Sequence, residues 1–446
     1  MPPVAELTHR RVLAIALPIV LANLTVPLLG LVDTAVVGQL GAAAPIGAVG
    51  LGAVILTSVY WVFGFLRMGT TGLVAQAHGA GDEAESGAVL KRGLLVAGAA
   101  GLALIALQAP LIWAAFRVAP ASAEVEALTR TYLDIRIWGA PATIAAYALT
   151  GWLIAVERTR AVLVLQLVMN GLNIGLDVWF VLGLGWGVAG VAWATIIAEY
   201  AGLALGLWLC ASAFTGPKGR ILDGPRLRRM AAVNTDIMLR SVLLQASFTT
   251  FLFVSAGQGD AVLAVNQILM QFLQLTAYML DGFAFAAESL VGQAVGAKAA
   301  PRFARAVRLT SAWGVGGAAA LALVFAVAGG PAIDLMTTAP ELQEKARAFL
   351  PWVVAAPLVG IASWMFDGIF IGATRTREMR DAMLGAVVLY GAALWLFWGF
   401  GNHGLWAALT VLNAARGVLM ALYYPRIPES LGAPRPAWAI RRAPPG

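Results

Sequence analysis

The amino-acid sequence predicts an all-α integral membrane protein with twelve transmembrane helices in two six-helix bundles. Three observations support this fold class: a strongly apolar composition, twelve segments long enough to cross a bilayer, and an internal repeat. Hydrophobic residues make up 60% of the 446 residues, and charged residues only 12%. A soluble protein carries about 25% charged residues, so most of this surface is expected to face lipid.

Each of the twelve segments is mainly apolar and is close to or above the ~20 residues that an α-helix needs to cross the hydrocarbon core. Backbone amides in hydrocarbon need partners within their own segment, so these segments are expected to be helices. They cover residues 12–38, 45–77, 88–116, 129–156, 161–184, 188–214, 231–256, 262–296, 305–334, 346–373, 382–400 and 404–425.

Lysine and arginine are distributed unevenly over the loops. If the N-terminus is cytoplasmic, 22 of the 30 basic residues, from Arg10 to Arg442, lie inside, four lie outside and four lie within apolar segments. This positive-inside pattern predicts a multi-pass protein of the plasma (inner) membrane with both termini in the cytoplasm. It also accounts for the net charge of +7 without a nucleic-acid partner.

An internal repeat relates the two halves. LVAQAHGA at 73–80 and LVGQAVGA at 290–297 are 217 positions apart. The same offset superimposes Arg130 on Arg347, Gly151 on Gly368, Gly187 on Gly404, and the Arg-Thr-Arg run at 158–160 on that at 375–377.

The repeat predicts an N-lobe at 1–217 with six helices and a C-lobe at 218–446 with the other six. A polar cytoplasmic linker at about 215–230 joins them. An even number of helices per lobe makes the repeats parallel, related by a pseudo-two-fold axis along the membrane normal. Transporters with internal repeats bind substrate between the repeats and alternate access by rocking them.

Carboxylates within the bilayer are costly unless they are paired, protonated or hydrated, so each marks a candidate functional site. The clear cases within the predicted spans are Asp33, Asp177, Asp281, Glu288 and Asp367, with Glu199 as a sixth. The alternative is a structural ion pair with Arg67, Arg136, Arg240 or Arg416. Glu199 and Arg416 hold equivalent repeat positions, and the sequence leaves open whether they are structural or functional.

Four polar residues of the first half are predicted to lie at one depth. Asp33, Asn173, Asp177 and Thr195 each lie within about two or three turns of the outer end of a helix, roughly 10 Å below the surface. Two carboxylates, an amide and a hydroxyl could share protons or hold a sodium ion, since neighbouring carboxylates cannot easily both ionise. Alternatively, they are unrelated polar groups in helix packing.

The second half carries a different set of acids. Asp281 and Glu288 are seven residues apart on the eighth helix and share a face, and Asp367 lies on the tenth. No acid stands 217 positions before any of them, so the lobes are expected to have specialised. We expect these acids to line a substrate cavity that favours cations.

Three further residues within the spans are candidates for a role in transport. Tyr147 and Tyr278 are expected to line an apolar part of the cavity, although packing is the ordinary role of such an aromatic residue. Pro18 removes a backbone hydrogen bond from the first helix and predicts a kink there.

The sequence resembles the multidrug and toxic compound extrusion family, and in detail its DNA-damage-inducible F branch. The resemblance extends from about Arg10 to Tyr424. Its motifs are PLLGLVDTAVVGQLGAAAPIGAVGLG at 27–52, LVAQAHGAGD at 73–82, the pattern from Asn173 to Asp177 with LGLGWGVAGVAWAT at 182–195, and the ERTR/ATRTR pair at 157–160 and 373–377.

The resemblance implies a multidrug antiporter that exports organic, often cationic, compounds in exchange for protons or sodium ions. It implies that Asp33, Asn173, Asp177 and Thr195 form the coupling site, with Pro18 bending the first helix. It implies no cofactor beyond the coupling ion, no bound metal, and small organic substrates and membrane lipid as the partners of a monomer.

The resemblance is incomplete in the second half. Family members with a second-lobe cation site use an acid of the tenth helix, here Asp367, and one of the seventh. This sequence has no carboxylate between Asp236 and Gly257. The departure favours proton coupling in the first lobe over sodium coupling in the second.

Two other functions remain open from the sequence. A flippase for lipid-linked saccharides has a similar two-lobe shape, but its cavity tends to be basic. In this sequence the ionisable residues within the predicted spans are mainly acidic. A membrane-embedded enzyme needs a buried nucleophile with a base or a metal cluster, and none of the three histidines lies inside a predicted span. The sequence therefore predicts a transporter and not an enzyme.

Overall fold

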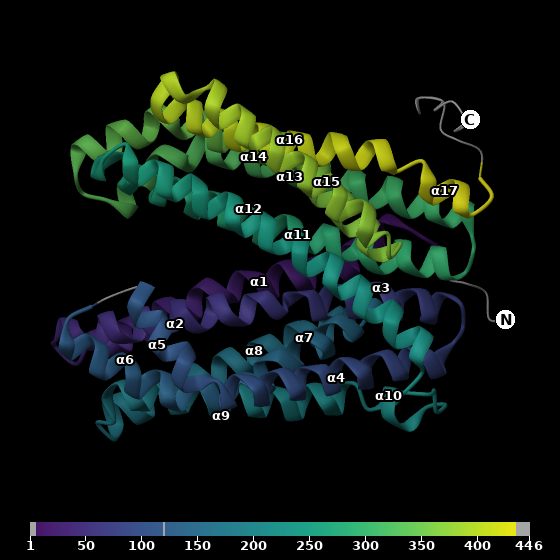
Figure 1. The fold of residues 1–446 in the computed structure, drawn as a ribbon, viewed down its shortest axis with the longest axis horizontal. Helices are drawn as coiled ribbons and strands as arrows, with labels where there is room; N and C mark the ends of the chain where they lie inside the picture. Colours follow the sequence, from purple (N-terminus) through teal and green to yellow (C-terminus); the bar gives the residue numbers. More distant parts are fainter. Residues whose placement is uncertain (1–5, 119–120, 434–446) are drawn as a thin grey trace. The chain divides into compact units, whose positions relative to one another are not determined.

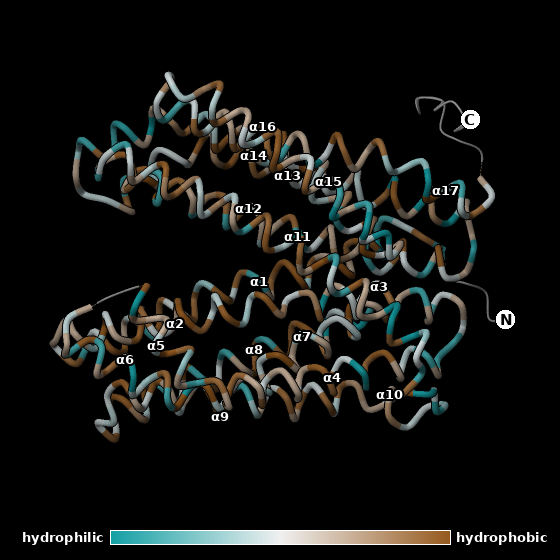
Figure 2. The backbone as a smooth tube through the Cα atoms, viewed as in Figure 1, coloured by the Kyte–Doolittle hydropathy of each residue, from teal (hydrophilic) through white to brown (hydrophobic). Residues whose placement is uncertain are grey.

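The computed structural model of the protein describes residues 6–118 and 121–433 (Figure 1). Within these ranges the secondary structure is helical, and twelve helices are long and apolar enough to cross a membrane. The predicted fold class is therefore confirmed. Figure 2 shows the apolar residues distributed along the lengths of these helices. Arg435, Arg441 and Arg442, which contribute to the predicted orientation, lie outside the described residues, as do both termini.

The first six spans are formed by eight helices, some joined by short non-α segments, and a ninth helix, α5, follows the third span. A 3₁₀ turn joins α2 to α3, another joins α6 to α7, and a π-helix extends α8. The bounds are α1 (His9–Gly38), α2 (Ala43–Trp61), α3 (Phe65–Gly79), α4 (Glu83–Ala106), α5 (Gln108–Val118), α6 (Ala123–Arg136), α7 (Ala140–Ala155), α8 (Thr159–Asp177) and α9 (Gly187–Leu209).

The last six spans are formed by longer, less interrupted helices. A short helix, α10 (Ser212–Thr215), precedes them and another, α17 (Arg426–Ser430), follows them. The bounds are α11 (Gly224–Gly257), α12 (Asp260–Gly296), α13 (Ala300–Met336), α14 (Pro340–Gly372), α15 (Thr376–Leu396) and α16 (Gly401–Tyr423).

The third predicted segment, 88–116, differs from the structure. Helix α4 begins earlier, at Glu83, where Asp82 caps it by accepting a hydrogen bond from the Glu85 amide. It ends at Ala106, and α5 is a separate helix. Pro110 explains the break, because a proline has no amide proton to donate to the Ala106 carbonyl and its ring crowds that group.

The chain packs as two compact units. The N-unit comprises Leu21–Val74 and Asp82–Arg228, and the C-unit comprises Met1–Val20, Ala75–Gly81 and Arg229–Gly446. The first part of α1 and the last part of α3 therefore pack with the C-unit. This division by packing differs from the division by sequence repeat at residue 217.

Equivalent helices pack in the same pairs in both units. Helices α4 and α7 pack together in the N-unit, and their counterparts α13 and α14 do so in the C-unit. The pair α8 and α9 corresponds in the same way to α15 and α16. The turns agree as well, since Glu157 and Thr374 both adopt a positive φ and close the same pattern of two helix-ending hydrogen bonds.

The glycines matched by the repeat serve the same contact in each unit. A Cβ added to Gly151 on α7 would meet the Arg67 carbonyl of α3, and one added to Gly368 on α14 would meet the Ala284 carbonyl of α12. Arg67 and Ala284 are themselves 217 positions apart. Small residues let membrane helices approach closely, so both glycines are required by the distance between backbones.

We predict that Gly368→Ala destabilises the protein, whereas Gly391→Ala does not. The added methyl group at Gly368 meets backbone, which no side-chain rotation can relieve, so we expect a loss of about 1–3 kcal/mol. Gly391 on α15 has no atom within 4 Å of its added Cβ. Thermal unfolding of the two purified variants checks this, and equal melting temperatures would contradict it.

Candidate functional site

Asp33 and Asp177 approach each other in the N-unit. Asp33 lies on α1 and is half-buried, and Asp177 ends α8 and is fully buried. Their carboxyl groups lie within hydrogen-bonding reach of each other. The Oδ1 atom of each is buried and has no hydrogen-bond partner. Two ionised carboxylates repel at this distance, whereas a proton on one of them can form a hydrogen bond between them.

Asn173 and Thr195 complete the predicted group of four. Asn173 Nδ2 donates to Thr195 Oγ1 over 3.2 Å. With the amide reversed, Nδ2 instead donates to Asp177 Oδ2, and the amide oxygen accepts from the amide and hydroxyl of Thr195, each over 3.2 Å. In this reversed orientation both polar atoms of the amide have a suitable partner, so Asn173 joins Asp177 to Thr195 of α9. The structure thus brings all four residues together.

The helix that carries Asp177 changes its hydrogen-bonding pattern directly after it. Residues Val178–Gly183 form a π-helix, and the Trp186 amide donates to the Phe180 carbonyl over 2.9 Å. Trp186 also stacks on Phe180, with ring centroids 4.8 Å apart. A π-helix is rare and frequent at functional sites. Apart from the glycines at its end, no feature of the sequence predicts this π-helix.

A buried ion pair lies beside the carboxylate pair. Arg136 of α6 donates to both carboxylate oxygens of Glu199 of α9, over 2.8 and 3.0 Å. Its guanidinium is within electrostatic reach of Asp33 and of Asp177. Tyr60 of α2 donates to the Arg136 carbonyl over 3.5 Å. Glu199 is therefore paired with Arg136, which answers part of the question that the sequence left open.

The equivalent residue, Arg416, pairs within the C-unit. Arg416 of α16 donates to Asp367 Oδ2 over 2.8 Å and to Asn413 over 3.2 Å. Arg240 of α11 donates to the same Asp367 oxygen, and Asp367 Oδ1 is buried without a hydrogen-bond partner. Asp367 is thus held by two buried arginines, an arrangement that the sequence had offered as the alternative to a cavity position.

The remaining predicted cavity residues are distributed over both units. Glu288 is buried on α12 and Asp281 is half-buried on the same helix. Gly282, next to Asp281, packs against α1 at Ala16. Tyr147 is half-buried and packs on the apolar core of the N-unit. Tyr278, also half-buried, lies on α12, one turn before Asp281.

Pro18 lies inside α1, which is helical from His9 to Gly38. The helix is therefore not broken at this proline. The boundary between the two packing units falls two residues later, between Val20 and Leu21.

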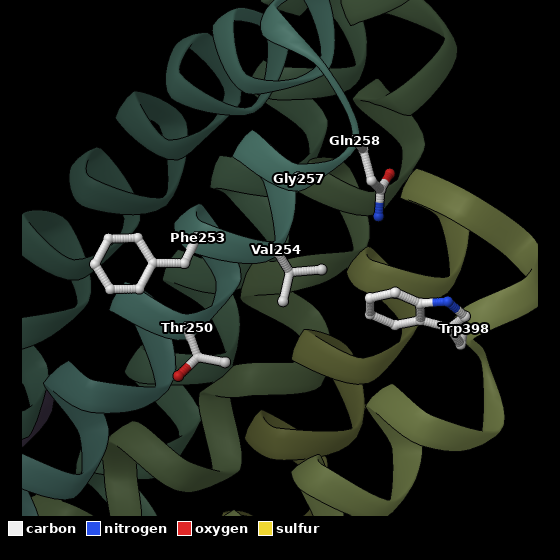
Figure 3. A pocket seen from close by; sticks show the side chains of 6 residues that line it. All are labelled: Thr250, Phe253, Val254, Gly257, Gln258 and Trp398. Carbon is white, nitrogen blue, oxygen red and sulfur yellow. The ribbon is translucent and has the colours of Figure 1, made fainter.

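Two grooves lie apart from these residues. Figure 3 shows one of about 350 Å³ in the C-unit, lined by Thr250, Phe253, Val254, Gly257, Gln258 and Trp398. Phe253 and Trp398 are largely exposed, as expected for side chains that face lipid. The other, of about 390 Å³, lies between α2, α5 and α6 of the N-unit. Neither groove contains a predicted site residue.

No group of three or more histidine, cysteine or acidic side chains that could hold a metal ion occurs among residues 6–118 and 121–433.

Acidic side chains that face each other inside the bilayer are typical of proteins that move ions or substrates through it. Together with the two helical units they define a membrane transporter. The family model MatE matches residues 18–179 and, again, residues 237–394. These matches cover more than half of the chain, which therefore belongs to the MatE family of transporters and is not an enzyme. The two matches, one in each half, agree with the internal repeat.

Relatives match along nearly the whole chain. DNA damage-inducible protein F of Escherichia coli is 41% identical over 92% of this chain and 91% of its own. A probable multidrug resistance protein NorM of Deinococcus radiodurans is 31% identical over 90% of this chain and 91% of its own. The chain thus spans almost the full length of these transporters.

Solved structures agree with the fold. The Vibrio cholerae MATE transporter VcmN, in its bent form, has a TM-score of 0.85 at 23% identity over 95% of this chain and 98% of that chain. A MOP superfamily transporter from Pyrococcus furiosus has a TM-score of 0.83 at 19% identity over 96% of this chain and 97% of that chain.

We predict that Glu199→Gln destabilises the protein by about 3–5 kcal/mol, because it leaves the buried charge of Arg136 without its partner. Replacing both residues, as Arg136→Met with Glu199→Met, removes the charge as well and is expected to cost much less. Thermal unfolding in detergent measures both. A double variant as unstable as Glu199→Gln would show that the pair stabilises the fold through something other than charge compensation.

Proposed function

We propose that this protein is a proton-coupled antiporter that exports organic cations. The observation that carries this proposal is the carboxyl pair of Asp33 and Asp177, with its unpartnered buried oxygens. Taking up one proton relieves the repulsion between them and the cost of burying a second charge. The pair is therefore suited to exchange a proton for a bound cation.

Asn173 of α8 connects the carboxyl pair to the neighbouring helix, α9, through hydrogen bonds. Its amide nitrogen donates to Asp177 Oδ2, and its amide oxygen accepts from the amide and the hydroxyl of Thr195, each over 3.2 Å. An ionised Asp177 accepts a stronger hydrogen bond from this amide than a neutral acid does. In our proposal, protonation of Asp177 therefore weakens the hold on the side chain that joins α8 to α9. In our proposal α1, which carries Asp33, then bends at Pro18 and releases the substrate outward.

Sodium is the alternative coupling ion, since carboxylate, amide and hydroxyl oxygens can also bind it. The acids of the C-unit argue against a second sodium site. Asp367 is held by Arg240 and Arg416. Asp236 accepts from Arg380 over 2.6 Å and from Thr376 over 3.2 Å. The charge of each of these two acids is already compensated by at least one arginine, which supports protons as the coupling ion.

The names of relatives agree with drug export, since NorM of Deinococcus radiodurans is described as a probable multidrug resistance protein. We place both termini in the cytoplasm on the strength of the charge distribution, and we infer a monomer in the inner membrane from the resemblance to the family. Export of a lipid-linked saccharide is the second candidate. The two arginines on Asp367 favour it, because an anionic head group needs cationic partners.

We predict that the affinity for a cationic substrate falls as the pH is lowered, and that sodium has little effect. The physical reason is that proton and cation compete for the same carboxyl pair, so each disfavours the other by about 1–3 kcal/mol. Binding to the purified protein, measured at several pH values with and without sodium, tests this directly.

The variant Asp33→Asn is the matched test of the site. It should retain membrane expression, lose the pH response of binding and abolish drug resistance in cells. Retained efflux in Asp33→Asn would remove this residue from the mechanism. A strong sodium dependence at fixed pH, without a response to pH, would replace the proton with sodium. Tight binding of a saccharide diphosphate lipid but no organic cation would favour the flippase.

We further propose that Asp281, Glu288 and Asp367, with Tyr147 and Tyr278, shape the substrate cavity. We predict that Asp281→Asn weakens the binding of a cation about tenfold and leaves a neutral compound of similar size unaffected, because the field of a carboxylate acts on charge. Asp260→Asn, at the exposed start of the same helix, is the matched control. Equal losses for charged and neutral compounds would show that Asp281 acts through structure alone.

A further inference from the structure

The two copies of the repeated motif pack against each other. The end of α3, Ala75–Gly81, belongs to the first repeat by sequence but packs as part of the C-unit. Its neighbours there include the end of α12, which carries the second copy of the motif. Both copies lie at the end of the helices that the positive-inside pattern predicts to be cytoplasmic.

The contact between the motifs is made by backbone on backbone, and it occurs twice. A Cβ added to Gly79 would meet the backbone of Gln293, and one added to Gly296 would meet the backbone of Gln76. The offset of 217 carries Gly79 onto Gly296 and Gln76 onto Gln293. The same close approach is therefore made once from each repeat. We refer to these four residues as the glycine crossing.

A network of side-chain hydrogen bonds joins the crossing to α11 and to the turn after α14. Gln76 Nε2 donates to the Gly372 carbonyl and to Thr374 Oγ1, each over 3.0 Å. Arg229 Nη2 donates to Gln76 Oε1 over 2.7 Å and to Thr374 Oγ1 over 3.2 Å. Gln76, Arg229 and Thr374 thus contact one another in a closed triangle.

Both partners of Gln76 are held in place by their own surroundings. Thr374 has a positive φ of 51°, and the turn around it is closed by hydrogen bonds from its own amide and from that of Arg375. Arg229 lies at the end of the linker, in the helical part that begins α11 at Gly224. Earlier in the linker, the Ile221 carbonyl accepts a hydrogen bond from Arg92 of α4 over 2.8 Å. Arg92 itself is buried and paired with Glu85 over 2.7 Å. The triangle therefore needs little ordering to form.

We propose that Gln76, Arg229 and Thr374 form a latch that closes the predicted cytoplasmic end of the transporter, with the glycine crossing beneath it. This inference rests on the proposed function, because alternating access requires the two repeats to separate at this end once in each cycle. Gln76 belongs to the first repeat, whereas Arg229 and Thr374 belong to the second. Separation of the repeats, with the whole of α3 moving with the first repeat, breaks the hydrogen bonds of Gln76 and parts the two glycines from the backbones that they touch.

The linker gains a role in this arrangement. It connects the repeats covalently, and Arg229 at its end also binds the first repeat through Gln76. The linker thus favours the closed state, which opens when Gln76 leaves the carbonyl of Gly372. The latch consists of four hydrogen bonds, two between neutral groups and two donated by the charged guanidinium of Arg229. So small a number suits a latch, because each bond can be exchanged for a hydrogen bond to water.

The latch is tested by cysteine labelling of the purified protein in vesicles. The natural cysteine, Cys210, is buried and is removed as Cys210→Ala. Ala75→Cys then provides the reporter, because Ala75 is fully buried against Gly292 in this closed state. A membrane-impermeant maleimide is added to inside-out vesicles, without substrate. We expect Gln76→Leu and Arg229→Gln to raise the rate of labelling about tenfold, which corresponds to about 1.4 kcal/mol.

Matched controls separate the latch from general loosening. Gln258→Leu makes the same change at the opposite end of α11, and Arg228→Gln makes it at the exposed neighbour of Arg229. Both should label at the parent rate. Parent-rate labelling of Gln76→Leu and Arg229→Gln, or equal increases in the two controls, would overturn the latch.

A second experiment covers the case in which the latch variants fold poorly. Gln76→Cys and Thr374→Cys, joined by a short thiol cross-linker in the Cys210→Ala background, should block transport until the link is reduced. Unchanged transport with complete cross-linking would overturn the proposal. Labelling requires neither a drug nor a proton gradient, so raised labelling without any transport would refute the proposed function and leave the latch standing.

Discussion

Every ionised side chain within the hydrocarbon core has to be paired, hydrated or protonated, because the core does not solvate charge. The buried charges of this protein meet the condition in two ways. Glu199 is paired with Arg136, and Asp367 with Arg240 and Arg416. The carboxyl groups of Asp33 and Asp177 lie close to each other instead, and one buried oxygen of each has no hydrogen-bond partner. In our proposal, a shared proton meets the condition at this second kind of site.

Close backbone contact is the second constraint, and it explains why the duplication is still visible. Gly151 and Gly368 fill the same role in the two units, as do Gly79 and Gly296 in the glycine crossing. Any larger residue at these positions meets backbone, so the spacing of helices depends on them. The charged positions are under no such shared constraint. The paired acids of the N-unit therefore have no counterpart in the C-unit.

Helices α1 and α3 each contribute residues to both packing units. They therefore take part both in the carboxyl pair or its unit and in the close backbone contacts of the C-unit. Asp33 lies in the N-unit part of α1, whereas Ala16 lies in the part that packs on Gly282 of α12. Helix α3 changes unit between Val74 and Ala75, directly before the residue that belongs to the latch. In our proposal, a change at the carboxyl pair is transmitted along α1, and a change at the latch along α3.

The sequence by itself determined the membrane fold, the number of spans, the duplication and the four polar residues of the N-unit. Hydropathy and the repeat can be read directly along the sequence. The rise per residue of a helix then gives the depth in the membrane of residues such as Asp33, Asp177 and Thr195. Only the tertiary structure decided which opposite charges pair, because Arg136 and Glu199 are 63 positions apart and pairing depends on how helices pack. For the same reason the sequence did not reveal the two arginines on Asp367, the π-helix after Asp177, or the contact of Gln76 with Arg229. Each of these is set by side-chain geometry between helices that no local pattern encodes.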